Sequence, residues 1–268
     1  MNAVVLELVA IPARSLRRAM IWWALGIAAL VAMTMSVWPA FEGSSGISQA
    51  MDQLPAGVVQ AFGLQDFGTP AGFLRANLYD FFVPLLVAVA AVMFVNGQTA
   101  GEESAGRLEL YFAQPVSRRV QFAGRAVAAG LALVALVAVL LAVQVASDAA
   151  VGLRIDGAYV VATIVLTGLL AALHGGLALA LAGWRARPSL VLGIGLGSVF
   201  AGLVVYSLFP LSDVLSPWRH ISPWDWAFGG APLERGTEIW RYLALAVPAF
   251  ALAAFGVFAV SRRDVTGG

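Results

Sequence analysis

The sequence contains no cysteine and no lysine among its 268 residues, and only two histidines. The missing cysteines exclude disulfides, thiolate metal sites and cysteine nucleophiles. The missing lysines exclude a Walker A loop, because that loop needs a lysine to contact the β- and γ-phosphates of ATP. Two histidines are too few for a three-histidine metal site within one chain. The chain is therefore not expected to hydrolyse ATP by itself, to hold a metal or to carry catalytic residues.

Charged residues are also scarce, at 12% of the chain, whereas 60% of the residues are hydrophobic. Soluble domains carry about 25% charged residues. The apolar residues form six uncharged runs, and a helix needs about 20 residues to cross a bilayer. We expect an all-α membrane protein with a single transmembrane domain over residues 1–268 and spans near 19–40, 80–100, 125–147, 158–184, 188–210 and 240–261. The first run has 23 residues, which is too long for the apolar region of a signal peptide, so we expect it to be retained.

The arginines predict the orientation of these spans. With a cytoplasmic N-terminus, eleven arginines fall in cytoplasmic segments and five on the other side, which fits the positive-inside rule. The eleven are Arg14, Arg17, Arg18, Arg107, Arg118, Arg119, Arg125, Arg185, Arg187, Arg262 and Arg263, and the five are Arg75, Arg154, Arg219, Arg235 and Arg241. All eight tryptophans lie near span ends or in outer loops, as an aromatic belt would. We expect both termini in the cytoplasm of a bacterial cell (inner) membrane, since arginine in place of every lysine indicates a GC-rich bacterium.

The segments between the spans are too short for independent domains. Residues 2–15 are apolar on several faces and predict a short helix along the inner membrane surface that turns at Pro12. The outer segments are 41–78 and 211–239. We expect short interfacial helices in the first and a Trp- and Pro-rich loop pressed into the interface in the second.

The cytoplasmic loop 101–123 holds the densest charge, with six charged residues between positions 101 and 119. Leu108, Tyr111 and Phe112 follow a helical spacing, and Pro115 would end that helix. Carboxylates before this apolar face and arginines after it suit a docking surface. A solvated loop whose arginines only set the topology explains the spacing equally well.

The same stretch closely resembles the hallmark of ABC-2 type transporter permeases. The resemblance rests on Gly101, Glu102, Glu103, Gly106, Leu108, Glu109 and Leu110, followed by Gln114, Pro115, Val116, Ser117, Arg118 and Arg119. Weaker similarity covers residues 21–26, 54–55, 61–63, 68–73, 222–224 and 231–233. The chain departs from the pattern at Ser104–Ala105, where many relatives carry more charge, and at Arg107, where threonine is common.

The resemblance implies the permease half of an ATP-binding-cassette exporter. The loop with these residues, together with Tyr111 and Phe112, would be a coupling helix seated on a separate cytoplasmic ATPase. That partner would carry ATP and Mg²⁺, and transport would need a second permease copy, identical or related. Membrane lipid is the other expected partner, and nucleic acid is not one. The nearly uncharged spans favour a lipid-like, drug-like or peptide substrate.

Several residues within the spans have both a packing and a functional interpretation. His174 suits interhelical packing better than a proton relay, and Gly193 with Gly197 predicts a helix-contact face rather than a nucleotide loop. Asn96 and Gln98 would face either a translocation cavity or, more in keeping with their place, the interface.

Pro84 and Pro248 would either kink spans two and six or act as hinges there. Two other functions would need particular residues within the membrane. An ion-coupled secondary transporter usually has acidic residues at mid-membrane, and a membrane-embedded enzyme needs a nucleophile–base pair or metal ligands there. None of the six uncharged runs contains a carboxylate, since the second run begins at Phe81, directly after Asp80, and this disfavours both functions.

Overall fold

The computed structural model describes residues 2–41, 53–55, 68–104, 116–185 and 187–262, and every regular element in these ranges is a helix. Six helical segments of the described chain are long and apolar enough to cross a membrane, as predicted. They comprise α1 (Asn2–Phe41), the series α4 (Pro70–Leu74), η1 (Arg75–Tyr79), α5 (Phe82–Gln98) and α6 (Ala100–Ser104), then α8 (Arg118–Val151), α9 (Gly157–Trp184), α10 (Pro188–Leu208), and α13 (Ile239–Ala259) with the 3-10 turn η4 (Val260–Arg262).

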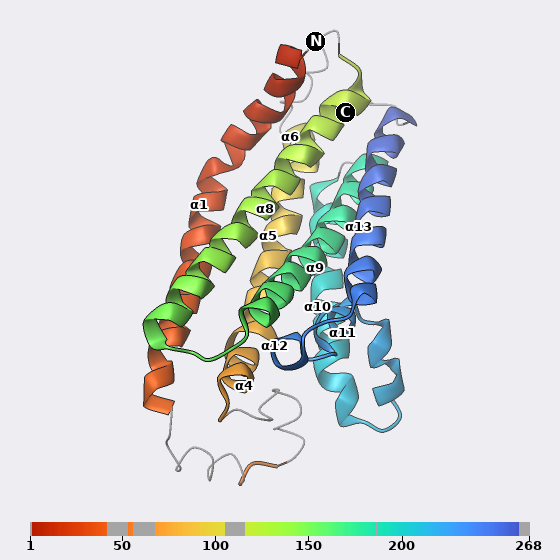
Figure 1. The fold of residues 1–268 in the computed structure, drawn as a ribbon. Helices are drawn as coiled ribbons and strands as arrows, with labels where there is room; N and C mark the ends of the chain where they lie inside the picture. The colour runs from red at the N-terminus through yellow and green to blue at the C-terminus, as the bar shows by residue number, and fades with distance from the viewer. Residues whose placement is uncertain (1, 42–52, 56–67, 105–115, 186, 263–268) are drawn as a thin grey trace.

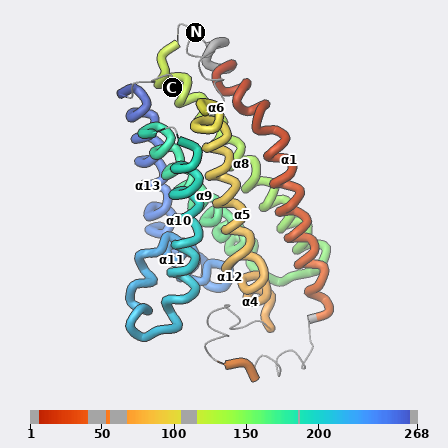
Figure 2. Tube along the Cα trace, turned by 180° about the vertical axis from the view of Figure 1, so that it is seen from behind, coloured from red at the N-terminus to blue at the C-terminus, as the bar shows by residue number. Residues whose placement is uncertain are grey.

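Helices α5 and α9 form the centre of the bundle. Helices α1 and α8 pack together on one side of them, and α10 and α13 lie on the other (Figure 1). Figure 2, from behind, shows α5 between α1 and α10. The most apolar windows of the second and fourth spans are 61% and 67% buried, against at most 28% in the other four. The other four therefore present most of the apolar surface that lipid would cover.

The two ends of the bundle differ in charge. We call the end that holds the start of α1, α6, the start of α8, the end of α9 and η4 the terminal end, and the opposite end, which holds residues 209–238, the loop end (Figure 1). Nine described arginines lie toward the terminal end and five toward the loop end, in the groups predicted from the sequence. Arg107 and Arg263 lie outside the described residues. Which end faces the cytoplasm stays a prediction.

Helix α1 continues through Pro12, so the predicted turn at that residue is absent. Its 40 residues would extend about 60 Å. Proline has no N–H, which leaves the carbonyl of Leu8, four residues earlier, without its helical donor. Gly124 of α8 packs against that carbonyl so closely that a Cβ there would lie 2.7 Å from the Leu8 oxygen. A tertiary contact thus covers the place where local sequence predicts a break.

The second span is interrupted rather than continuous. Thr69 caps α4 by accepting a hydrogen bond from the Gly72 N–H at 3.0 Å, and the π-helix η1 follows. The chain leaves the helical region at Phe81 before α5 begins. Pro84 therefore lies in the first turn of α5, where its missing N–H costs little, and not within a continuous helix. Pro248, by contrast, lies inside α13.

Helices α9 and α13 approach closely at glycines. A Cβ on Gly183 would lie 2.1 Å from the carbonyl oxygen of Gly256, and a Cβ on Gly256 would lie 2.4 Å from that of Leu179. Small residues let membrane helices approach at backbone distance in this way.

The contact face predicted at Gly193 and Gly197 is wrong for the described chain, because both are exposed and a Cβ at either would meet no described atom within 4 Å. The buried face of α10 instead carries Gly195, against Val92, and Gly202, against Trp224. These two are seven residues apart, close to two helical turns, so they share a face that excludes Gly193 and Gly197.

The segment between α10 and α13 folds into the short helices η2 (Phe209–Leu211), η3 (Ser216–Ile221), α11 (Pro223–Phe228) and α12 (Pro232–Arg235). Ser222 donates its hydroxyl to the carbonyl of Gly202 at 2.7 Å, about one and a half turns before α10 ends. Trp224 is fully buried among the helices. The aromatic-belt prediction is therefore wrong for Trp224 and for Trp38, which is buried against Phe73, whereas Trp22 and others are exposed.

A buried polar chain joins three helical segments toward the loop end. The Tyr79 hydroxyl donates to Gln144 Oε1 at 2.9 Å, and Gln144 Nε2 donates to Asp148 Oδ1 at 2.7 Å. Gln144 Nε2 also lies 3.7 Å from the sulfur of Met35 in α1. The Gln144 side chain is fully buried and connects α8 to the second span and to α1.

Candidate functional site

The predicted coupling stretch is described at its two ends. Gly101, Glu102 and Glu103 lie on α6, and Val116, Ser117, Arg118 and Arg119 lead into α8. The members that lie outside the described residues are Gly106, Leu108, Glu109, Leu110, Tyr111, Phe112 and Pro115. The amphipathic helix expected there stays a prediction. The two described ends emerge together at the terminal end of the bundle (Figure 1).

Helix α6 carries the acidic end of the stretch. Glu102 and Glu103 occupy its first turn, where carboxylates interact favourably with the helix dipole, and both are half-buried. The N–H of Glu103 donates to the carbonyl of Thr99 at 3.1 Å. A Cβ on Gly101 would lie 3.0 Å from the carbonyl oxygen of Asn96, so glycine lets α6 fold closely against the end of α5. The two carboxylates are thereby held at a defined place.

The basic end is defined by a helix cap. Ser117 has extended backbone angles and accepts a hydrogen bond from the N–H of Val120 at 3.4 Å, which starts α8 at Arg118. The helix thus begins before the predicted span 125–147, because arginines are good helix formers and do not end it. The Arg119 guanidinium lies 5.9 Å from the centre of the Phe258 ring, and that of Arg262 lies 4.5 Å from it. The start of α8 is therefore held beside the end of α13.

Gln98, near this site, faces neither a cavity nor the membrane interface, the two positions predicted from the sequence. It is 3% exposed and donates from Nε2 to Ser15 Oγ of α1 at 2.7 Å. Asn96 is half-buried and lies two residues earlier on α5. A contact between helices explains the polar side chain of Gln98.

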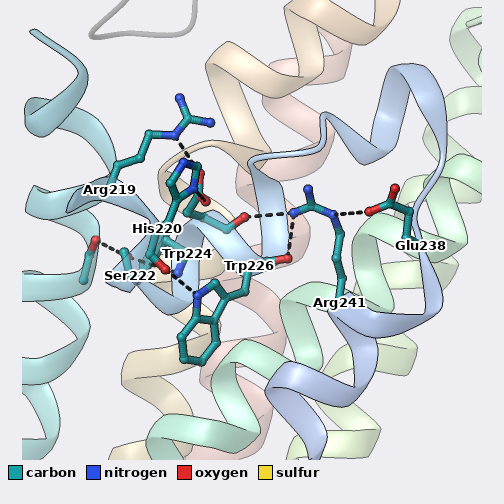
Figure 3. Close-up of polar contacts among 9 residues, drawn as sticks. Arg219, His220, Ser222, Trp224, Trp226, Glu238 and Arg241 are labelled. Atoms are coloured by element: carbon teal, nitrogen blue, oxygen red, sulfur yellow. Dashed lines mark hydrogen bonds and ion pairs between the residues drawn. The ribbon is translucent and has the colours of Figure 1, made fainter. Parts of the chain in front are cut away.

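A second polar cluster lies at the loop end, and Figure 3 shows it. The carboxylate of Asp225 is 8% exposed and contacts Arg219 Nε at 3.0 Å and His220 Nδ1 at 2.7 Å. Trp226 donates from its indole to the carbonyl of His220 at 2.7 Å. These contacts join η3 to α11.

Arg241 at the start of α13 completes this cluster (Figure 3). One of its terminal nitrogens donates to the carbonyls of Asp225 and Trp226, both at 3.0 Å, and its Nε lies 3.7 Å from the carboxylate of Glu238. A cation at the last carbonyls of α11 compensates their partial negative charge. Arg241 thereby connects the short helix α11 to α13, the sixth span.

Arg75 of η1 ties the same segment to span two. It pairs with Asp80 at 3.3 Å and donates to Glu234 of α12, although 159 positions separate Arg75 and Glu234. Sequence reasoning missed these pairs. The only available signal was the presence of opposite charges in the two outer segments, which does not say which residue meets which.

His174 of α9 makes a packing contact. Its Nδ1 lies 2.9 Å from Ser198 Oγ of α10, and that hydroxyl donates to the Gly195 carbonyl at 2.8 Å. Because the hydroxyl hydrogen is used in this way, His174 Nδ1 donates to the serine oxygen. Among the described residues, no group of three His, Asp or Glu side chains could hold a metal ion. The packing interpretation of His174 fits this geometry.

The terminal end therefore presents carboxylates and arginines around the predicted coupling stretch. At the loop end, ion pairs and hydrogen bonds connect the short helices to each other and to spans two and six.

Comparison with protein families matches residues 7–260 to the family described as the multidrug efflux system permease Rv1217c, C-terminal domain. The chain belongs to this family. No curated protein matches the sequence. The match and the six apolar helices identify a transporter permease domain that crosses the membrane several times.

Proposed function

We propose that this efflux permease domain is the transmembrane half of an ATP-binding-cassette exporter of the ABC-2 type. The family match supports efflux, and the motif between Gly101 and Arg119 resembles the coupling stretch of that type. Because the chain has no lysine, it has no Walker A loop, and ATP must be hydrolysed by another polypeptide to drive transport. A separate ATPase with ATP and Mg²⁺ carries out this hydrolysis, and a second permease copy completes the translocation pathway.

The observation that carries this proposal is the position of α6. Its two carboxylates stand at the terminal end among the larger group of arginines, and the stretch between α6 and α8 begins and ends there. In the proposed complex, Glu102 and Glu103 pair with basic residues of the ATPase. Partly desolvated charge pairs set the register of such an interface more than its raw affinity. In this proposal the terminal end of the bundle faces the cytoplasm of a bacterium, so both ends of the chain lie on the cytoplasmic side of the cell membrane.

The proposed substrates are lipid-like or drug-like molecules or apolar peptides. The described spans carry few charges, and charged residues in the described spans lie toward their ends. An apolar pathway favours molecules that partition into the bilayer, in line with the multidrug efflux described for the family.

The test is charge reversal at α6. The permease is purified from its native membranes, and the ATPase that accompanies it is identified by mass spectrometry and titrated against the permease. Glu103→Arg should weaken this binding, since losing one partner of a buried charge pair costs about 2–5 kcal/mol and a rim pair much less. Asp213→Arg is the matched control, because Asp213 is an exposed acid at the loop end.

Two results decide the proposal. Weaker ATPase binding by Glu103→Arg, with normal binding by Asp213→Arg, supports coupling through this stretch. Equal binding by both variants and the wild type, or purification of an active exporter with no ATPase, would refute it.

A further inference from the structure

Span two is broken a second time toward the terminal end, where α5 ends at Gln98 and α6 begins at Ala100. Thr99 between them has φ −124° and ψ −96°, outside the helical region. Its hydroxyl donates to the carbonyl of Val95 at 2.7 Å, and its N–H donates to that of Asn96 at 3.3 Å. The last carbonyls of α5 carry partial negative charge and need partners that a continuous helix would have supplied.

Arg125 of α8 supplies one such partner. It is 7% exposed, and one of its terminal nitrogens donates to the carbonyl of Gln98 at 2.8 Å. A buried cation in an apolar bundle is costly unless it is hydrogen-bonded, so its position relative to this carbonyl is strongly constrained. Arg125 therefore fixes the end of α5 to α8.

The side chain of the same Gln98 fixes this point to α1. Its Nε2 donates to Ser15 Oγ at 2.7 Å, and Ser15 donates to the carbonyl of Pro12 at 2.8 Å. Three helices thus meet at one residue, immediately before the carboxylates of α6. We call Ser15, Gln98, Thr99 and Arg125 the Thr99 junction.

We propose that Arg125 and Gln98 are positioning residues of the coupling apparatus. They hold the end of α5, next to the start of α6, to α1 and α8, so that a displacement of α6 moves α1, α5 and α8 together. This role rests on the proposed function, in which an ATPase displaces α6. Without the junction, the break at Thr99 would absorb the displacement, since a few residues at the end of an element can take up large changes in φ and ψ.

The first measurement uses the permease domain alone and so does not depend on the ATPase. Spin labels are attached at Ala19→Cys in α1 and Ser104→Cys in α6, both exposed, in a chain that has no cysteine of its own. Distances between the labels are measured by pulsed EPR in lipid nanodiscs. Arg125→Met and Gln98→Leu should broaden the distance distribution, and Arg125→Lys should restore its width.

The second measurement uses the permease with its co-purified ATPase in proteoliposomes, with ethidium as the transported probe. Arg125→Met and Gln98→Leu should lower ethidium transport per ATP hydrolysed by about tenfold, a typical size for coupling between sites. ATPase binding should be unchanged. Gln144→Leu is the control, because it removes an equally buried amide from the other end of α8 and should leave the ratio intact.

The outcomes separate the two proposals. A distribution as narrow in Arg125→Met as in the wild type, or an equal loss of coupling in Gln144→Leu, overturns the positioning role. If the wild type binds no ATPase, the proposed function fails, and the EPR distances alone then decide whether Arg125 and Gln98 position α6.

Discussion

The contact between α9 and α13 gives the sharpest prediction about stability. In Gly183→Ala, the new methyl group would lie 2.1 Å from the carbonyl oxygen of Gly256, and ordinary contact begins at 3.4 Å. Relieving the clash by separation requires about 1.3 Å, the difference between these distances. The neighbouring contact of Gly256 with Leu179 would loosen at the same time. Overpacking of this kind typically costs about 1–3 kcal/mol.

Gly197→Ala is the matched control. Gly197 lies in the middle of α10, is exposed, and has no described atom within 4 Å of an added Cβ. Both substitutions gain about 1 kcal/mol in helix propensity, so their difference isolates the packing term. We expect Gly183→Ala to be less stable than Gly197→Ala by about 1–3 kcal/mol.

The assay is unfolding of the purified permease domain in mixed micelles with increasing SDS, followed by the fluorescence of its eight tryptophans. If Gly183→Ala unfolds at the same SDS fraction as Gly197→Ala, the close approach of α9 and α13 is not a determinant of stability. The reasoning from the Cβ distance would then be refuted.

In intact cells, an impermeant maleimide should label Asp213→Cys and not Ser117→Cys; labelling of Ser117→Cys from outside would reverse the proposed orientation. Asp225→Ala should lower the free energy of unfolding by about 1.5–3 kcal/mol, because it leaves Arg219 without its carboxylate, whereas Asp213→Ala should change it by less than about 0.5 kcal/mol; equal effects in the SDS titration would contradict the buried role of Asp225. The purified permease domain alone should hydrolyse no ATP in a phosphate-release assay, and robust hydrolysis free of contaminants would refute the assignment of catalysis to a partner.

The six apolar helices could be predicted because the signal is local. A run of about 20 uncharged residues determines that a segment can cross a bilayer, whatever it packs against. The helical cap at Ser117 is local in the same sense, since a serine before a helix accepts from the N–H groups of its first turn.

The rest depends on partners distant in the chain. From the sequence, Pro12 predicts a break in the helix. In the structure α1 continues through it, and Gly124 of α8 packs on the Leu8 carbonyl that the proline cannot hydrogen-bond. The pairing of Arg75 with Glu234 joins residues 159 positions apart, and the sequence alone offers several equally good acids. Which glycines of α10 are buried depends on which face meets α5, and spacing alone does not settle that.

The contacts of Arg75 and of Arg125 have one feature in common: each lies at a break in span two. Toward the loop end, Arg75 and Asp80 pair just before the chain leaves the helical region at Phe81. At the terminal end, Arg125 holds the carbonyl of Gln98 beside Thr99. Helix α5 between the breaks is packed against α9 and α10 by small and apolar residues, which resist internal deformation. A regular helix bounded by two breaks moves most easily as a unit, so the ion pair of Arg75 with Asp80 at one end and the hydrogen bond from Arg125 to Gln98 at the other constrain how far α5 can shift within the bundle.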